Sequence, residues 1–248
     1  MGGAYHRRRP TVPRHRGDRS MPTPTPCPTA PECAGAETME RVIALSIEAL
    51  LPRYRRGIEN FDRRIFSLTP EQYDRAFPAD AGVGAWPVRV LLGHLADAEL
   101  VYAHRMRRAV AEDHPVLAVW DENAFVDANV YGLGGRPTAG PAPGSRGDAH
   151  TTSMGGFLAV VHTLRLWTAD WMATLTPDQW KRRALHPERG PLTVHQMLGT
   201  ATWHLEHHAR FLRAKLDRLF GAGRTPVPDA AKGQESCGTG CGCAKPAR

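Results

Sequence analysis

Three histidines stand at positions where a helix would bury apolar side chains, and together they could bind a metal ion. His204 and His208 are four residues apart in TWHLEHHARFL, so on a helix they project from one face. His94 interrupts a second apolar stripe, between Leu91 and Ala98. The apolar residues in line with the first pair are Val194, Met197, Ala201 and Leu212. Three imidazoles on facing helices can satisfy their ring nitrogens by sharing a divalent ion.

From the residues alone, these histidines could form a metal site or could be ordinary core histidines. A single H-x-x-x-H pair is weak support for a metal site, and a histidine in an apolar face is more often bonded to a backbone carbonyl. The occurrence of such histidines in the stripes of two separate helices makes a metal site about as good an explanation as separate core histidines. With three protein ligands and an open fourth position, this would be a site of the catalytic type, which water or substrate completes.

Such an ion could do two kinds of chemistry. It could lower the pKa of a bound water to about 7 and support a hydrolase, or hold a thiol as a thiolate and support a thiol transferase. A structural or vestigial site, in a non-catalytic protein that binds a metal or small ligand, is the third possibility. Asp97, one turn after His94, is a candidate to orient a ligand or the bound water.

Other charged residues are weaker candidates. Glu99 and Asp121 could support the site, although a solvated helix face or an ordinary salt bridge explains them as well. Glu206 lies between the two histidines of the last helix but points away from their face, so the H-E-x-x-H pattern of zinc proteases is absent. Three arginines could bind an acidic substrate: Arg89, Arg105 and Arg210.

All five cysteines lie outside the helical part of the chain, which favours a reducing compartment and a cytoplasmic location. Three of them are closely spaced among glycines near the C-terminus, in a C-x3-C-x-C pattern: Cys237, Cys241 and Cys243. This tail could bind a soft metal ion or form a redox pair, or it could have no specific role.

The histidines require long helices to position them, and the apolar spacing predicts four. The fold class is therefore all-α, a four-helix bundle without convincing strands. Pro52 is expected to kink or restart the first helix, and Thr-Pro pairs or a Thr-x-x-Gln box open later ones. The helices are expected at 39–51 continuing through 54–68, 87–112, 154–175 with a stripe that includes Trp167, and 193–220.

The formal net charge of +7 belongs to the ends of the chain. Residues 1–20 carry a net +5 and residues 221–248 a net +2, so the part between is electrically balanced. No nucleic-acid partner is expected for the folded domain, and no apolar run is long enough to span a membrane. We expect a disordered Arg/Pro-rich segment 1–38, a bundle 39–221 with a flexible Gly/Pro-rich loop 132–153, and a flexible tail 222–248. The true start could be Met1, Met21 or Met39.

The run WPVRVLLGHLADAE from Trp86, with the later HPERGPLTVHQML and HLEHH, resembles the DinB/YfiT-like superfamily over about residues 40–220. The resemblance implies a four-helix bundle that binds a divalent metal through His94, His204 and His208, and a frequent homodimer. It implies a small-molecule substrate, with a metal-dependent hydrolase or a thiol S-transferase using bacillithiol, mycothiol or glutathione as the activities. Zn²⁺ or Ni²⁺ is the expected ion, with Fe²⁺, Mn²⁺ or Co²⁺ as alternatives. Pro87 departs from the family, where a Ser often follows the Trp.

Overall fold

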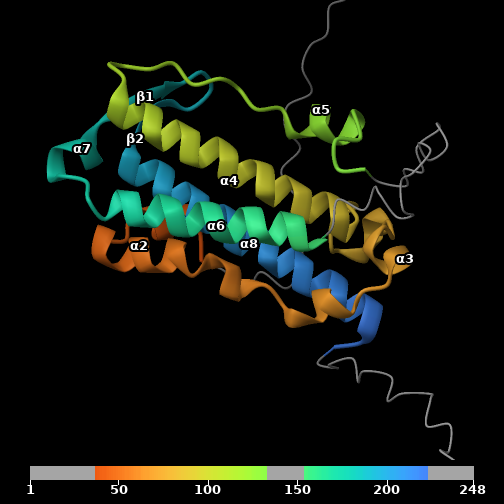
Figure 1. Cartoon of the computed structure of the whole chain (residues 1–248). Coiled ribbons are helices and arrows are strands. Elements are labelled where there is room, and N and C mark those ends of the chain that lie inside the picture. Colours follow the sequence, from red (N-terminus) through yellow and green to blue (C-terminus); the bar gives the residue numbers. More distant parts are fainter. Residues whose placement is uncertain (1–36, 133–153, 223–248) are drawn as a thin grey trace, which may run out of the picture. The chain divides into compact units, whose positions relative to one another are not determined.

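The computed structural model describes residues 37–132 and 154–222. Its four main helices are α2 (Ile47–Arg55), α4 (Val88–Ala111), α6 (Met154–Met172) and α8 (Val194–Phe220). Helix α4 packs against α6 and α8, and α2 packs against the same two helices, so the four close into a ring (Figure 1). The prediction of a four-helix bundle is confirmed.

The start of the bundle differs from the sequence prediction. The chain breaks between α1 (Met39–Ile43) and α2, because the side chain of Ser46 accepts the N–H of Ala49 and begins a new helix. Pro52 lies inside α2 rather than at a restart. After Arg55 the α-helix is replaced by two short 3-10 helices, at Gly57–Asn60 and Arg63–Ser67, so the predicted continuation to Leu68 is wrong.

Three helices begin at the threonines that the sequence marked. Thr69, Thr176 and Thr193 each form a capping box, in which the threonine hydroxyl and a glutamine three residues later satisfy each other's backbone N–H. These residues open α3 (Pro70–Tyr73), α7 (Pro177–Lys181) and α8. A further short 3-10 helix spans Ala79–Ala81, and α4 starts after Pro87 without a side-chain cap.

A small β-hairpin stands before α8 and was not predicted. Strand β1 (Arg183–His186) pairs antiparallel with β2 (Gly190–Thr193), with Arg183 opposite Thr193 and His186 opposite Gly190. Val116, in the segment after α4, forms a parallel bridge with Leu185. The inward positions of β1 are Ala184 and His186, so its polarity does not alternate and gives no strand signal.

The buried faces of α4 and α8 are mostly apolar, as their stripes predicted, but α6 differs. Trp167, placed in the predicted stripe of α6, is 54% exposed, whereas Arg165 is completely buried. The guanidinium of Arg165 bonds Glu99 of α4, the carbonyl of Tyr54 in α2 and the carbonyl of Ala201 in α8. One arginine of α6 therefore links the three other helices of the ring.

Most of the predicted flexible segments, with Cys237, Cys241 and Cys243, lie outside the described residues. Within the two described ranges, none of the helices combines the length and apolarity that crossing a membrane requires.

Candidate metal centre

Helix α4 brings His94 into the interior, where the side chain is almost fully buried, with 2% of its surface exposed. Two indole rings enclose it. Trp86, just before α4, lies with its ring centre 5.0 Å from that of His94, and Trp120 stacks on the imidazole at 5.1 Å. Such contacts restrict rotation of the imidazole, so His94 is held in one orientation.

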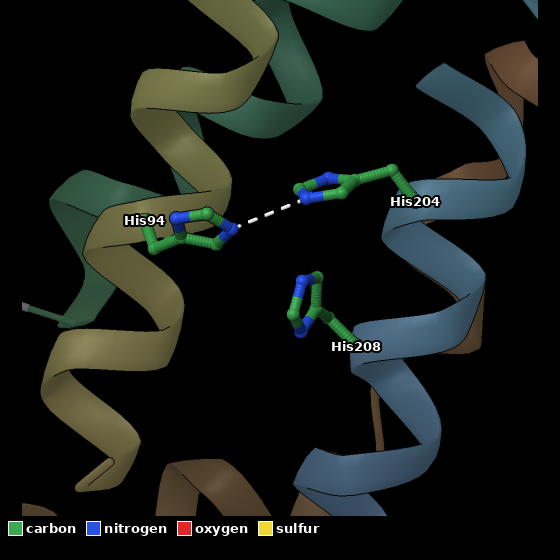
Figure 2. A group of neighbouring side chains, drawn as sticks. All are labelled: His94, His204 and His208. Atoms are coloured by element: carbon green, nitrogen blue, oxygen red, sulfur yellow. Dashed lines mark hydrogen bonds between the residues drawn. The ribbon is translucent and has the colours of Figure 1, made fainter. Parts of the chain in front are cut away.

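Helix α8 supplies the other two histidines from successive turns. The ring centres of His204 and His208 lie 4.5 Å apart, and each lies about as close to His94, at 5.0 and 4.9 Å. In Figure 2 the three imidazoles converge in the space between α4 and α8. The structure thus brings together the three residues that the stripes selected.

The nitrogen atoms of this group have the spacing of a metal site. One ring nitrogen from each histidine lies within 4.8 Å of the others, and Nε2 of His94 lies 3.1 Å from Nε2 of His204. Two nitrogen ligands at a normal zinc distance and a tetrahedral angle are about 3.3 Å apart. The pair therefore fits a shared ion with little movement, although 3.1 Å also fits a hydrogen bond between two neutral imidazoles.

Burial keeps these imidazoles in the form that binds metal. It lowers the pKa of His94 to about 4. It also lowers the pKa values of His204 and His208 well below the ordinary value, and the neighbouring histidines add to that effect. All three are consequently neutral at pH 7, with lone pairs available to a cation.

Several buried polar atoms around His94 have no hydrogen-bond partner among the described residues. They are Nδ1 of His94, Oδ2 of Asp97, Nε1 of Trp120 and the hydroxyl of Tyr131. Asp97 lies one turn after His94, as predicted, but bonds none of the three histidines. Burial raises its pKa, and its carboxyl lies near the Tyr131 hydroxyl without hydrogen-bond geometry. Its predicted role as an orienting residue stays a prediction.

The other acidic candidates have structural roles. Glu99 is buried in the ion pair with Arg165, and its second carboxylate oxygen accepts the hydroxyl of Tyr54. Asp121 caps α5 (Glu122–Asp127) by accepting two backbone N–H groups. Glu206 points away from the histidines and pairs with Arg53 of α2, as its helical position indicated.

The three candidate arginines lie in three different environments. Arg89 is buried, paired with Asp74 and stacked on Tyr73, so neither a surface position nor a substrate role fits it. Arg210 is exposed. Arg105 is half-buried and lines a cleft near the histidines.

The indole walls of the site were not identified from the sequence. Trp120 is half-buried and stacks on His94. The ring centre of Tyr102 lies 5.9 Å from that of His204. Aromatic residues at helical spacing are typical of any core, so only the contacts distinguish them.

Comparison with known families decides where this chain belongs. The model of the DinB superfamily matches residues 53–212, more than half of the chain and including all three histidines. The chain belongs to the DinB superfamily. The resemblance given by the Trp86 run and the HLEHH segment is thereby confirmed.

Relatives of this DinB protein are provisionally named metal-dependent hydrolases. YfiT of Bacillus subtilis is 29% identical over 140 residues, which cover 56% of this chain and 67% of YfiT. OB0782 of Oceanobacillus iheyensis is 26% identical over 144 residues, which cover 58% and 70%.

The solved structure of Bacillus subtilis YfiT supports the fold of this DinB protein. It aligns with a TM-score of 0.55 at 22% identity, and the alignment covers 75% of this chain and 91% of YfiT. That protein is described as a probable metal-dependent hydrolase with an unusual four-helix bundle topology. Metal-dependent relatives and the three-histidine site together indicate a divalent metal for this family member.

Proposed function

We propose that this DinB protein is a metal-dependent hydrolase whose divalent ion is held by His94, His204 and His208. The convergence of three imidazoles between α4 and α8, with one nitrogen from each within 4.8 Å of the others, carries the proposal. When bound, a divalent ion supplies a water acidified to a pKa of about 7 and polarises the substrate.

The chain contributes a neutral and rigid ligand set. Three uncharged imidazoles leave the positive charge of the ion uncompensated, which favours its action on a water or a carbonyl oxygen. Trp86 and Trp120 hold His94 in place and shield it from solvent. Imidazole donors suit Zn²⁺ and Ni²⁺, which are the ions we expect, and Fe²⁺, Mn²⁺ and Co²⁺ are alternatives.

The first experiment measures metal content in the purified full chain. We expect about one divalent ion per chain in the native protein and little in His94→Ala, His204→Ala or His208→Ala. His207→Ala is the matched control, because His207 neighbours the site on α8 but stacks on Trp203 outside the cluster. Undiminished metal in all three variants would overturn the proposal.

The second experiment measures turnover. We expect hydrolysis of simple esters or amides to stop with a chelator and return with the ion. Turnover of a thiol and an electrophile in place of hydrolysis would change the proposal to a thiol S-transferase. A full metal content with neither activity would indicate a binding protein.

The homodimer implied by the family resemblance stays a prediction. Light scattering would test it by measuring the molar mass of the protein as it elutes from a size-exclusion column.

A further inference from the structure

A second feature lies beside the histidines, at the end of the α4–α8 contact near the β-hairpin. It is a narrow cleft between α4, α8 and the hairpin, with room for a group of about the size of one water molecule. Its polar lining consists of Tyr102, Arg105, His186, Arg189 and Thr200. The lining is unusual because two arginines face one small space.

The two arginines are not neutralised by hydrogen-bonded carboxylates. Arg105 donates to the carbonyl of Ala118, and Arg189 is exposed and has no hydrogen bond or ion pair within 37–132 and 154–222. Glu188 is the nearby acidic residue, and its exposed carboxylate bonds neither arginine in those ranges. The guanidinium groups thus keep donors free for a ligand.

His186 adds a third donor. It is buried at the inner side of β1, and its Nδ1 accepts the backbone N–H of Glu188. The neutral ring therefore carries its proton on Nε2. Burial and both arginines lower the pKa of His186, which agrees with a neutral ring beside two positive charges.

The cleft adjoins the three-histidine site. Tyr102 lines the cleft and also packs against His204, and Thr200 lies one turn before His204 on α8. The four residues between them correspond to about 6 Å along the helix axis. The cleft and the histidine cluster therefore share Tyr102 as a common wall.

We infer that this cleft binds an anionic oxygen group, a carboxylate or a phosphate, at the end of the substrate remote from the reacting bond. Guanidinium groups recognise both through paired, charge-assisted hydrogen bonds. Leu117 and Leu192 form apolar sides of the cleft, so its polar groups lie on the sides of the arginines and His186. The position of the reacting bond rests on the proposed function, but the binding of the anion does not.

Calorimetric titration of the full chain with succinate and with inorganic phosphate tests this inference. We expect binding of at least one probe, weakened about tenfold or more by Arg189→Gln and by Arg105→Gln. The tighter probe distinguishes a carboxylate from a phosphate ligand. Arg183→Gln is the matched control, since Arg183 is exposed on the same hairpin but does not line the cleft. Because Arg105 holds Ala118, its variant is also checked for an unchanged melting temperature.

Titration of His208→Ala separates this inference from the proposed function. Equal probe affinity in that variant places the anion in the cleft rather than on a metal, whether or not the protein is a hydrolase. No binding of either probe at millimolar concentration overturns the inference, as does equal weakening by Arg183→Gln and Arg189→Gln. Loss of binding in His208→Ala alone also overturns it. The proposed function is tested by the metal content of the native protein, which these titrations do not measure.

Discussion

Arg165 of α6 and Glu99 of α4 form an ion pair inside the bundle, with 2.6 Å between Nη2 and Oε1 and almost no exposure of either side chain. Burial raises the pKa of Tyr54 well above its ordinary value, so its hydroxyl stays protonated and donates to the second oxygen of Glu99. Arg165 also donates to the carbonyls of Tyr54 and Ala201, and the two members of the pair belong to different helices of the ring.

Removing one member of this pair should destabilise the fold strongly. Arg165→Met leaves the Glu99 carboxylate buried without its cation, which costs about 3–5 kcal/mol of unfolding free energy. Urea denaturation measures the change. Arg165→Met combined with Glu99→Leu should recover much of the loss, because no charge then remains buried. A single variant within about 1 kcal/mol of the native protein would contradict this account.

Gly93→Ala should destabilise the protein, although alanine is normally the better helix residue by about 1 kcal/mol. A methyl group at Gly93 would lie 2.3 Å from the ring of Tyr131, which is buried. We expect a net loss of about 1–3 kcal/mol from the displaced ring. In a Tyr131→Leu background the same substitution should cost much less, and an equal cost in both backgrounds would show that Tyr131 is not the cause.

Lys215 gives a prediction on pH. Burial lowers its folded-state pKa from 10.5 to about 8, although its ammonium donates to the carbonyls of Val83 and Gly84. Below pH 8 both states carry the proton, and between about 8 and 10.5 the unfolded chain binds more protons. Stability of the native protein relative to Lys215→Met should therefore rise over that interval, by a few kcal/mol at most. Paired urea titrations at several pH values measure the difference, and a flat or falling difference would refute it.

Metal should stabilise the folded chain. An ion that binds only the native state at a free concentration about a hundred times its dissociation constant adds about 2.7 kcal/mol. We expect a chelator to lower the melting temperature of the native protein and of His207→Ala, and to leave His208→Ala unchanged. A chelator effect of equal size in His208→Ala would place the stabilising ion elsewhere.

The sequence predicted the histidine cluster better than it predicted the buried face of α6. The stripes of α4 and α8 identified His94, His204 and His208, because a polar ring at a core position stands out against leucine and alanine. In α6 the same reasoning failed. Trp167 is largely exposed, and Arg107 covers one face of its ring, with the guanidinium 3.5 Å from the ring centre. An apolar ring can be covered by a long charged side chain, and apolar spacing does not reveal this.

The cleft and the hairpin could not be predicted from the sequence, for a different reason. Arg105 and Arg189 are 84 residues apart. The spacing of apolar residues does not show that an arginine in a loop will lie near an arginine on a helix. The strands of the hairpin have only four residues each, and His186 occupies an inward position where an apolar residue would have marked a strand. Tertiary contacts therefore decide both features.

His94 and His204 are separated by 110 residues, yet their nitrogens meet between α4 and α8. An ion bound there would close a long loop, and much of the entropy of that closure must be lost before the third ligand can bind. The complete ligand set exists only after the first half of the chain has docked on its last helix. Metal uptake during refolding would therefore report the moment at which the bundle closes. The contact between α4 and α8 would open more readily in the metal-free protein than in the metal-bound protein.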